Sequence, residues 1–596
     1  MSWILPSVIL AVSTLCSGAI LENVADLNAL NLTFDFIVVG GGTAGNVVAN
    51  RLSENPNHKI LVLEAGGSNT GVLDIIVPSF CREATPNTAQ DWNYTTTPQV
   101  GLNGRSIAHN RGFVLGGSSS VSKSFIVEHQ YYMVYTRGSK EDFNRWAAVT
   151  EDDGWSWDNL LPYMTKNEIW SPPADNHNTA GKFDPAVHGF EGITAVSLSG
   201  FPTPIDSRII AATSELEGYP FNLDMNSGNP IGVGWGQLTV KDGERSSSAT
   251  SYLASQFLGR PNLYVLLNAR VTRVLETSGA VRTVEFVQDL NGEPLTLTAT
   301  KEVILSAGSI GTPNILLHSG IGNSSTLTTL GIQPVHNLPS VGQNLSDHTL
   351  LFLSFLVNST NTFETAVHNA TLAAEEFAQW NTSRTGPLVD NPLSHIGWLR
   401  VPNNSPVFEQ FGDPSAGPNT PHFELIIANG MIPPPPPEGN FLSVVPVVVS
   451  PASRGSVTLN TNDLLADPLI NPNHLGSEVD VFIMREAVKS AVRFTTAPAW
   501  DDYVLSAVGL NATTDAEIDA FVRANAATIY HPVGTASMSP RSAAWGVVDP
   551  DLRVKGLTGL RVVDLSVVPF IPAAHTQAAA YIIGERASDL IKESWN

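Results

Sequence analysis

The chain has very few cysteines and no cluster of basic residues. Only two of its 596 residues are cysteine. Cys16 lies in the apolar N-terminal stretch, so a mature chain would keep Cys81 alone and could form no internal disulfide. Lys and Arg number 32 against 55 Asp and Glu, a formal net charge of −23. Nucleic acid is therefore excluded as an expected partner, because phosphate binding relies on clustered Lys and Arg.

Long hydrophobic runs are also missing after the N-terminus. Residues 1–19 are apolar, end in small residues and are too short for a membrane span, so we interpret them as a signal peptide cut near Ala19. Later apolar runs such as "FLSVVPVVVS" are short and indicate buried strands, so we expect no membrane contact. We expect a secreted, extracellular glycoprotein, because the chain also carries N-x-S/T acceptor sites at Asn31, Asn93, Asn323, Asn344, Asn358, Asn369, Asn381, Asn403 and Asn511.

A nucleotide-binding pattern opens the mature sequence. From Phe34 the chain reads "FDFIVVGGGTAGNVVANRLSENPNHKILVLEAGG", an apolar run, a glycine turn, a small-residue helix and a second apolar run. This order predicts a βαβ unit whose helix N-terminus faces phosphate groups, although an ordinary glycine turn is the alternative. The pattern does not distinguish NAD from FAD. A carboxylate 19 residues after Gly45 is placed to bind ribose hydroxyls, and the predicted contacts are Gly40, Gly42, Thr43, Ala44, Gly45 and Glu64.

Three later segments are typical of further pieces of the same domain. They read "NLYVLLNARVTRVLE", "KEVILSAGSIGTPNILLHSGIG" and "GLRVVDLSVVPF", and Val271 in the first is a candidate for packing on adenine. The nucleotide-binding domain would then be discontinuous, with pieces at 31–139, 239–347 and 530–596. The substrate domain would comprise 140–238 and 348–529. Within it, "TTDAEIDAFVRANA" predicts a helix opened by a threonine cap.

Several motifs together resemble the glucose-methanol-choline (GMC) family of flavin oxidoreductases, and within it the fungal aryl-alcohol oxidases. They are the glycine turn, "DWNYTTTPQVGLNGRSIAHNRGFVLGGSSS", "SAGSIGTPNILLHSGIG", "VGQNLSDH", "HPVGTASM" and "PAAHTQAAAYIIGERASDLI". The resemblance implies FAD as the cofactor. It implies a fold of class α/β plus α+β, in which a Rossmann-like FAD-binding domain carries an inserted substrate domain built on an antiparallel sheet flanked by helices.

The resemblance also implies further cofactor contacts. Gly116 and Ser118 in "GGSSS" resemble pyrophosphate and flavin contacts, with a mobile Gly/Ser linker as the alternative. Asp564 in "LRVVDLSVVP" resembles a residue near the ribityl and pyrophosphate region, with a helix or turn cap as the alternative. We assign no metal ligands.

The resemblance further implies a catalytic pair, His531 and His575. Pro532 restricts the backbone of His531 to extended conformations. Oxidising an alcohol requires removal of the hydroxyl proton and transfer of a hydride from carbon to flavin, and a neutral imidazole suits the proton step. We therefore predict that His531 takes the proton of a primary alcohol held against flavin N5, while His575 hydrogen-bonds the same oxygen. A satisfied buried side chain is the alternative for either histidine.

Three residues are predicted to line the substrate pocket. Tyr94 and Tyr530 would provide aromatic walls, or would belong to the core, and Ile432 in "ANGMIPPPPPEG" takes the place of an aromatic gate. We predict oxidation of primary aromatic or related unsaturated alcohols to aldehydes. O2 would be reduced to H2O2, which could supply extracellular peroxidases.

One segment departs from the family pattern. Residues 122–130, "SKSFIVEHQ", stand between "GGSSSV" and "YMVYTRGS", two stretches that are almost adjacent in the family. They represent either a loop that alters cofactor access or retained intron sequence in the gene, and retained intron sequence is the interpretation we favour.

Three alternative functions stay open. The chain could be a sugar or alcohol dehydrogenase that passes electrons to quinones, because the sequence leaves oxygen and quinone open as acceptors. It could be a lyase similar to the plant hydroxynitrile lyases, which bind FAD without using its redox chemistry. It could also be a flavin-binding protein that residues 122–130 have inactivated.

Overall fold

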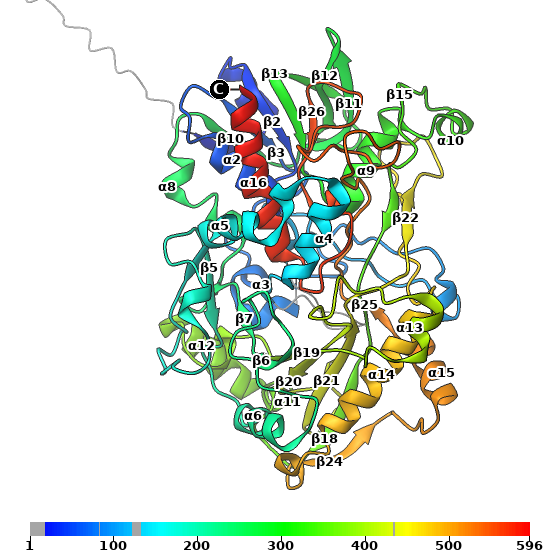
Figure 1. Cartoon of the computed structure of the whole chain (residues 1–596). Coiled ribbons are helices and arrows are strands. Elements are labelled where there is room, and N and C mark those ends of the chain that lie inside the picture. Colours follow the sequence, from blue (N-terminus) through cyan, green and yellow to red (C-terminus); the bar gives the residue numbers. More distant parts are fainter. Residues whose placement is uncertain (1–17, 83, 122–132, 433–434, 596) are drawn as a thin grey trace, which may run out of the picture.

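The computed structural model describes residues 18–82, 84–121, 133–432 and 435–595. The predicted signal peptide up to residue 17 and the predicted insertion at 122–130 lie outside the described residues. Two sheets, one in the upper and one in the lower half of Figure 1, organise the molecule. No helix in the described ranges combines the length and apolarity that a bilayer crossing requires.

The first sheet is the nucleotide-binding sheet. Its strand order is β1-β10-β3-β2-β13-β12-β11, and β26 also pairs with β13. The pairings from β1 through β13 and on to β26 are parallel, whereas β11, β12 and the first part of β13 form an antiparallel extension. Strands β2 (Phe34–Val39) and β3 (Ile60–Leu63) are almost entirely apolar, as strands covered on both faces are. All three segments predicted to return to this domain provide strands of this sheet.

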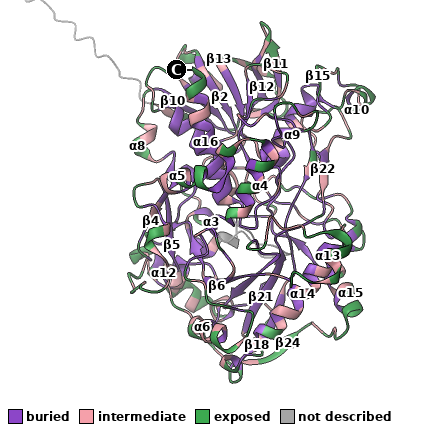
Figure 2. Ribbon diagram, in the orientation of Figure 1, coloured by how far each residue is buried: buried purple, intermediate pink, exposed green. Residues whose placement is uncertain are grey.

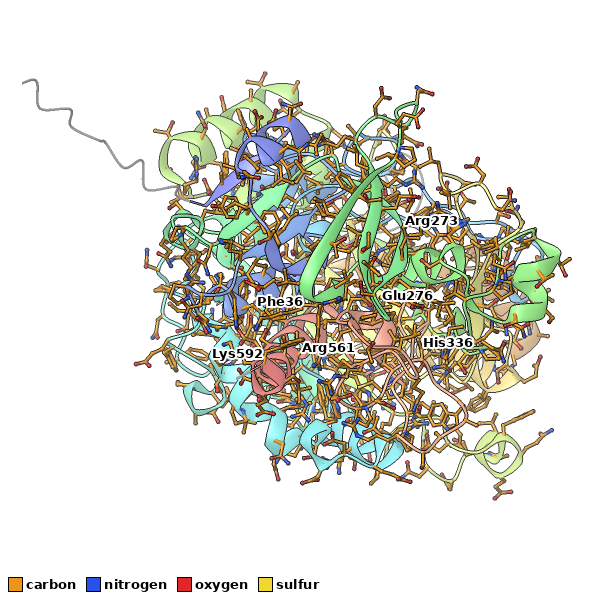
Figure 3. The ribbon with its side chains drawn as sticks, turned by 90° about the horizontal axis from the view of Figure 1, so that it is seen from above. Phe36, Arg273, Glu276, His336, Arg561 and Lys592 are labelled. Atoms are coloured by element: carbon orange, nitrogen blue, oxygen red, sulfur yellow. The ribbon has the colours of Figure 1, made fainter. Side chains whose placement is uncertain are left out.

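Two helices, one near the start of the sequence and one near its end, pack on each other beside this sheet. They are α2 (Thr43–Leu52), which follows the glycine turn, and α16 (Gln577–Trp595) at the C-terminus. Figure 3 shows β2 with Phe36 and the C-terminal region with Arg561 and Lys592 from above. Arg561 on β26 (Leu560–Val562) donates from Nε to Oε2 of Glu302 on β13 over 2.6 Å. This buried ion pair joins two strands that are far apart in the sequence.

Helices α4 (Lys140–Thr150) and α5 (Trp157–Asn167) also pack on the first sheet's core. Phe143, Trp146 and Trp157 belong to the same buried cluster as the strands β2 and β3. The predicted substrate domain begins at residue 140, and this limit stays a prediction. The large aromatic side chains of these helices bury against the core of the nucleotide-binding sheet.

The second sheet is antiparallel and carries the substrate domain. Its order is β24-β18-β21-β20-β19-β6, with β17 pairing β21 and β25. The predicted buried strand "FLSVVPVVVS" is β21 (Phe441–Val448), which is buried throughout. Helix α14 (Glu478–Phe494) packs on β20 and β21, and α15 (Asp515–Asn525) packs on α14. Thr514 caps α15 in a capping box with Glu517, which confirms the predicted helix start.

The combination of a Rossmann-like sheet and an antiparallel sheet confirms the predicted fold class. Figure 2 shows buried residues running through both sheets, with exposed residues on the outer helices and loops.

The remaining helices are α1 (Val24–Ala29), α3 (Leu73–Ile76), α6 (Asp206–Glu215), α7 (Ser248–Ser251), α8 (Ser255–Leu258), α9 (Gly308–His318), α10 (Ser324–Thr329), α11 (Phe363–Val367), α12 (Ala370–Ser383) and α13 (Pro406–Phe411). The other strands of the first sheet are β1 (Ala19–Leu21), β10 (Leu263–Leu266), β11 (Arg270–Thr277), β12 (Ala280–Val287) and β13 (Leu295–Leu305). Those of the second are β6 (Gly232–Trp235), β17 (Thr349–Leu350), β18 (Leu353–Val357), β19 (Leu393–Leu399), β20 (Phe423–Ala428), β24 (Val504–Val508) and β25 (Ala527–Thr528). Small sheets contain β4 (Glu168–Trp170), β5 (Thr194–Leu198), β7 (Gln237–Leu238), β8 (Val240–Lys241), β9 (Glu244–Arg245), β14 (Ile321–Gly322), β15 (His336–Asn337), β16 (Gln343–Leu345), β22 (Gly455–Thr458) and β23 (Leu469–Asn471).

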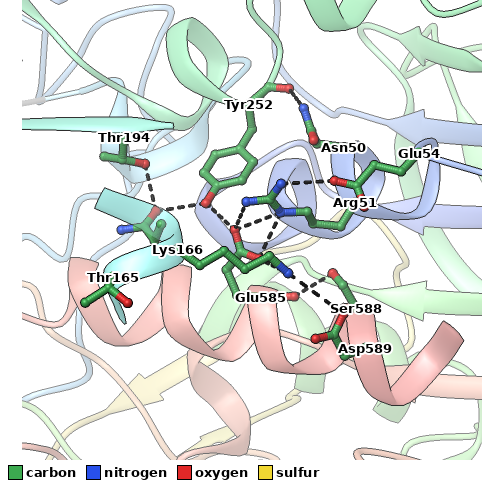
Figure 4. Close-up of polar contacts among 12 residues, drawn as sticks. Asn50, Arg51, Glu54, Thr165, Lys166, Thr194, Tyr252, Glu585, Ser588 and Asp589 are labelled. Atoms are coloured by element: carbon green, nitrogen blue, oxygen red, sulfur yellow. Dashed lines mark hydrogen bonds and ion pairs between the residues drawn. The ribbon is translucent and has the colours of Figure 1, made fainter. Parts of the chain in front are cut away.

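A buried polar cluster ties the glycine-turn helix to the C-terminal helix (Figure 4). Arg51 on α2 donates from Nη2 to Oε1 of Glu585 on α16 over 2.7 Å, and the hydroxyl of Tyr252 donates to the same oxygen over 2.6 Å. Lys166 on α5 lies 3.3 Å from the other oxygen of Glu585. The cluster therefore holds three helices around one fully buried carboxylate.

Candidate active site

The glycine turn forms an open cradle at the start of α2. Gly40 has φ of +100°, and a Cβ there would lie 2.5 Å from the carbonyl oxygen of Ser306, so only glycine fits. A Cβ on Gly45 would lie 2.0 Å from the carbonyl oxygen of Gly40. Gly42, by contrast, faces open space, with Gly117 Cα at 3.9 Å as the nearest atom. Two glycines thus allow close packing and the third leaves room for a ligand at the helix N-terminus.

Glu64 follows β3 and closes the other side of the cradle. Its carboxylate accepts backbone hydrogen bonds from Gly41 over 2.8 Å and from Gly66 over 2.7 Å. Burial raises the pKa of Glu64 to about 7, although these backbone N–H groups oppose the shift. The carboxylate is held rigidly where the βαβ pattern puts a ribose-binding acid, and that role stays a prediction.

A cavity that is partly open to solvent runs along the cradle. Ser309 Oγ and Asn314 Oδ1 on α9 belong to residues that line it, and both atoms find no hydrogen-bond partner within the described ranges. A long polar ligand such as a dinucleotide would satisfy them, so the residues present fit FAD. The predicted cofactor residues that line the cavity are Gly40, Gly42, Thr43, Ala44, Glu64, Ser118, Val271 and Asp564, whereas Gly45 and Gly116 pack behind it.

The "GGSSS" loop is joined to the cradle and to the catalytic segment. Gly116 donates its N–H to the carbonyl of Gly41 over 2.7 Å. Arg111 donates from Nη2 to Ser118 Oγ over 2.6 Å and from Nη1 to the carbonyl of Tyr530 over 2.7 Å. The loop therefore contributes to the cavity wall, and the predicted contacts of Gly116 and Ser118 with the cofactor stay predictions.

Asp564 has a structural role as well as a place in the cavity wall. One carboxylate oxygen accepts the N–H of Ser566 over 2.8 Å, so Asp564 caps the short helix that follows. The other accepts from the N–H of Gly308 over 2.9 Å and from Thr312 Oγ1 over 2.6 Å. The position of Asp564 therefore fits both predictions from the sequence, a residue near the ribityl and pyrophosphate region and a helix or turn cap.

The two predicted catalytic histidines lie together. The ring centroids of His531 and His575 are 4.9 Å apart, with the rings inclined by 76°. Both line a second cavity, which shares Thr43, Arg111, Ser118, Leu565 and Ala580 with the cofactor cavity. The pair therefore faces a space next to the place for the cofactor.

A buried carboxylate and a third histidine hold His531. Asp347 Oδ1 accepts the backbone N–H of His531 over 2.7 Å, and Nδ1 of His348 lies 3.0 Å from Nδ1 of His531. Burial lowers the pKa of His531 well below its usual value, and the nearby rings of His575 and His348 lower it further. His531 is therefore a neutral imidazole at ordinary pH.

The ring of His575 is held differently. Its Nε2 lies 2.8 Å from Oε1 of Glu424 on β20, and its backbone N–H donates to Thr136 Oγ1 over 2.9 Å. Glu424 is only 1% exposed. One histidine of the pair thus contacts a carboxylate through its ring and the other does so through its backbone.

The three residues predicted to line the substrate pocket are not among the described residues that line the cavity beside the histidines. Tyr94 stacks on Trp92 with ring centroids 5.5 Å apart and lines the cofactor cavity. Tyr530 and Ile432 are each 1% exposed, and neither is among the described residues that line the cofactor cavity or the second cavity. Tyr530 has φ of +63°, so its backbone turns in the left-handed region just before His531.

The second cavity has both polar and apolar walls among the described residues. Within the described part of the chain, no Phe, Tyr or Trp lines it. Its lining consists of Thr43, Arg111, Ser118, Ser119, Val121, Met133, Val134, Arg245, His531, Leu565, His575, Thr576, Gln577 and Ala580. It offers several hydrogen-bond donors and acceptors around the two imidazoles.

Sequence reasoning missed four residues of this site: Arg111, Asp347, His348 and Glu424. Asp347 and His348 end the motif "VGQNLSDH", which contributed to the family resemblance but suggested no role by itself. Glu424 stands in the apolar strand "FELIIA", where one acid among buried residues is the signal that could have identified it.

Comparisons with known proteins identify the family of this chain. Family models described as GMC oxidoreductase match residues 34–350 and 451–584. Pyranose dehydrogenase 3 of Leucoagaricus meleagris is 43% identical over 97% of this chain and 96% of its own length.

Two solved structures share the fold. A formate oxidase of Aspergillus oryzae, whose structure concerns FAD modification, has a TM-score of 0.86 at 29% identity and covers 94% of this chain and 98% of its own. A fungal aryl-alcohol oxidase has a TM-score of 0.81 at 27% identity and covers 94% and 99%. The chain therefore belongs to the GMC oxidoreductase family, as its motifs predict, and its cofactor is FAD.

Proposed function

We propose that this enzyme dehydrogenates a polyhydroxylated alcohol of the sugar class, and that a quinone-type acceptor rather than O2 reoxidises its flavin. The observation that carries the proposal is the set of hydrogen-bonding side chains among the residues that line the cavity beside His531 and His575. A sugar presents many hydroxyl groups, and a wall with Arg111, Arg245 and Gln577 can hydrogen-bond them. The relative named pyranose dehydrogenase, 43% identical, supports the sugar class of substrate.

The histidines carry the proton chemistry in this proposal. Nδ1 of His531 is engaged by His348, so Nε2 is the nitrogen that takes the proton as the substrate O–H bond breaks. His575 hydrogen-bonds the same oxygen and orients it. The bound flavin supplies the acceptor for the hydride that leaves carbon, so the alcohol becomes a carbonyl compound. A quinone then takes up two electrons and two protons and becomes a hydroquinone.

A second candidate is oxidation of a primary aromatic or unsaturated alcohol to an aldehyde, with O2 reduced to H2O2. The structural likeness to a fungal aryl-alcohol oxidase favours it. The stacked Trp92 and Tyr94 also provide an aromatic surface, although it lies on the cofactor cavity. In that case the H2O2 would be available to extracellular peroxidases.

We also propose that the enzyme is secreted. The support is the apolar N-terminal stretch and the exposed position of eight of the nine acceptor asparagines. An extracellular enzyme would meet free sugars and quinones, which fits the proposed substrates.

The decisive experiment is anaerobic flavin reduction followed by reoxidation. Purified holoenzyme is mixed with glucose or with 4-methoxybenzyl alcohol, the absorbance of the flavin is followed, and then 1,4-benzoquinone or air is admitted. We expect bleaching by the sugar and recovery with benzoquinone much faster than with air. Bleaching by the aromatic alcohol alone, with recovery and H2O2 in air, would establish the second candidate instead.

Two controls complete this experiment. The His531→Ala variant should keep its FAD but reduce it at least about a hundredfold more slowly, because general-base catalysis contributes that much. Mandelonitrile tests the lyase alternative, because release of cyanide without bleaching would contradict both redox proposals.

A further inference from the structure

The second sheet has two edges, and within the described part of the chain only one of them is covered. Its order runs from β24 at one edge to β6 at the other. Beside β6, Val233 donates its N–H to the carbonyl of Pro220 over 2.8 Å, and Asn222 donates to the carbonyl of Val233 over 2.9 Å. Strand β6 is buried at three of its four residues. The chain itself therefore closes this edge.

The opposite edge, β24, is apolar and exposed. The strand reads "VLSAV" and, among the described strands, pairs with β18 alone. Every residue after Val504 is exposed, with Leu505 at 59% and Val508 at 38%. Figure 1 shows β24 at the lowest part of the molecule. No residue of the strand lines the cofactor cavity or the second cavity, so neither cofactor nor substrate explains its exposure.

A strand of this kind can join two molecules. Its outer side presents backbone N–H and C=O groups that can pair with the same strand of a second copy. Natural edge strands are often protected by lysine or proline, and β24 contains neither. A register shift between Leu356 and Val357 disturbs only the start of β24. The edge therefore needs protection that its own side chains do not provide.

Two of the nine acceptor asparagines stand at the two ends of β24. Asn358 follows β18, and its N–H donates to the carbonyl of Tyr503, the residue before β24, over 2.8 Å. Asn511 lies three residues after Val508, the last residue of the strand. Both asparagines are exposed. The strand is about 17 Å long at 3.4 Å per residue, and bulky glycans attached at its two ends would cover that length.

We propose that N-linked glycans on Asn358 and Asn511 cover β24 and keep separate molecules from pairing along this strand. The proposal rests on the proposed secretion, which brings the chain to the glycosylation machinery. A lipid-linked oligosaccharide pyrophosphate donates the sugar. The bond from its C1 to the pyrophosphate oxygen breaks, a bond from C1 to Nδ2 forms, and Nδ2 releases one proton as the lipid pyrophosphate leaves. Each amide keeps one N–H, so Asn358 can retain its 3.4 Å contact with the carbonyl of Asp502.

The first test is glycopeptide mass spectrometry of the secreted holoenzyme. We expect glycans on both Asn358 and Asn511. If both are unmodified while other acceptors carry glycans, this proposal fails and the proposed secretion stands. A chain without any glycan would contradict both.

The second test measures self-association by sedimentation of the holoenzymes over a range of concentrations. The parent enzyme should be monomeric, whereas the average mass of Asn358→Gln/Asn511→Gln should rise about twofold or more as bare edges pair. The matched control, Asn381→Gln/Asn403→Gln, removes exposed acceptors on α12 and after β19 and should stay monomeric. Anaerobic flavin reduction should be the same in all three enzymes, because no substitution lines a cavity. A monomeric Asn358→Gln/Asn511→Gln enzyme would overturn the proposal.

A charge placed in the strand identifies the surface that associates. Leu505→Lys added to Asn358→Gln/Asn511→Gln should restore the monomer, because lysine on an edge strand opposes pairing. If the variant without glycans does not fold, an endoglycosidase is used to trim the glycans of the folded parent and of Leu505→Lys to single sugars. The trimmed parent should then associate and the trimmed Leu505→Lys enzyme should not. Association that Leu505→Lys fails to abolish would place the contact on another surface and overturn the proposal.

Discussion

Nδ1 of His348 and Nδ1 of His531 lie 3.0 Å apart, so the two imidazoles share one hydrogen between these atoms. When His531 is the donor, its Nε2 carries a lone pair and can take a proton. When His348 is the donor, Nε2 of His531 carries the hydrogen and cannot act as a base. Burial lowers the pKa of His348 to about 3, so this neighbour is neutral and the arrangement selects between two neutral tautomers.

Replacing His348 should therefore weaken the proton step without loss of the cofactor. In His348→Leu we expect kcat/KM for anaerobic flavin reduction to fall about tenfold or more, because His531 loses the partner that orients its ring. FAD content and thermal stability are measured alongside. His395→Leu, which changes a buried histidine on β19, should leave the reduction rate nearly unchanged. Equal rates in His348→Leu and the parent enzyme would remove His348 from the site.

Flavin reduction should stay fast in mildly acidic solution. In the proposed reaction the neutral form of His531 is the active one, and its pKa lies well below the usual value of 6.5 because of burial and the adjacent histidines. The acid limb of kcat/KM should therefore have its midpoint below pH 6.5. Stopped-flow reduction from about pH 4 to pH 8 measures it. A midpoint at or above 6.5 would show that His531 does not act as the base in the proposed state.

The carboxylate of Glu585 should be one of the most important single groups for stability. Its side chain is fully buried against Arg51, so Glu585→Gln leaves a buried cation poorly compensated and should cost about 3–5 kcal/mol. Asp589→Asn, four residues along α16 with a 36% exposed side chain, should cost less than about 1 kcal/mol. Calorimetric unfolding of the holoenzymes compares them. Similar transition temperatures for the two variants would contradict this role.

Glycosylation should distinguish Asn344 from the other acceptor sites. Its Nδ2 donates to Ser537 Oγ over 2.9 Å and to the carbonyl of Pro569 over 3.1 Å, so the nitrogen is engaged in the fold. Asn323 and Asn369 are exposed and use only their Oδ1 atoms as helix caps. Mass spectrometry of the secreted protein should find glycans at the latter two and none at Asn344. A chain with no glycan at any site would contradict the proposed secretion.

The nucleotide-binding half was predictable because its pattern is local. Gly40, Gly42 and Glu64 lie within one βαβ unit, so their spacing alone placed the cradle. The pairing of His531 with His575 came from the family resemblance, since nothing in their spacing shows that the rings meet. The roles of Gly116, Val271 and the domain limits stay predictions.

The residues that contact the rings of His531 and His575 could not be predicted from the spacing of residues in the sequence. His348 reaches His531 from β16–β17, and Glu424 reaches His575 from β20, so each contact depends on how the second sheet docks against the first. The aromatic pocket expected around Tyr94 and Tyr530 illustrates the same limit. Sequence neighbours of a catalytic residue need not face its cavity, because the left-handed turn at Tyr530 directs the chain elsewhere.

The strand β13 has a consequence for biosynthesis. It lies at the middle of the nucleotide-binding sheet and pairs with β2 near the start of the chain and with β26 near its end. A ribosome releases β26 and α16 only after β2, β13 and the whole second sheet, so the cradle can be completed only when these two elements have emerged. A stop codon ahead of β26 would therefore leave a chain that has its glycine turn but lacks a strand and a helix beside the place for the cofactor.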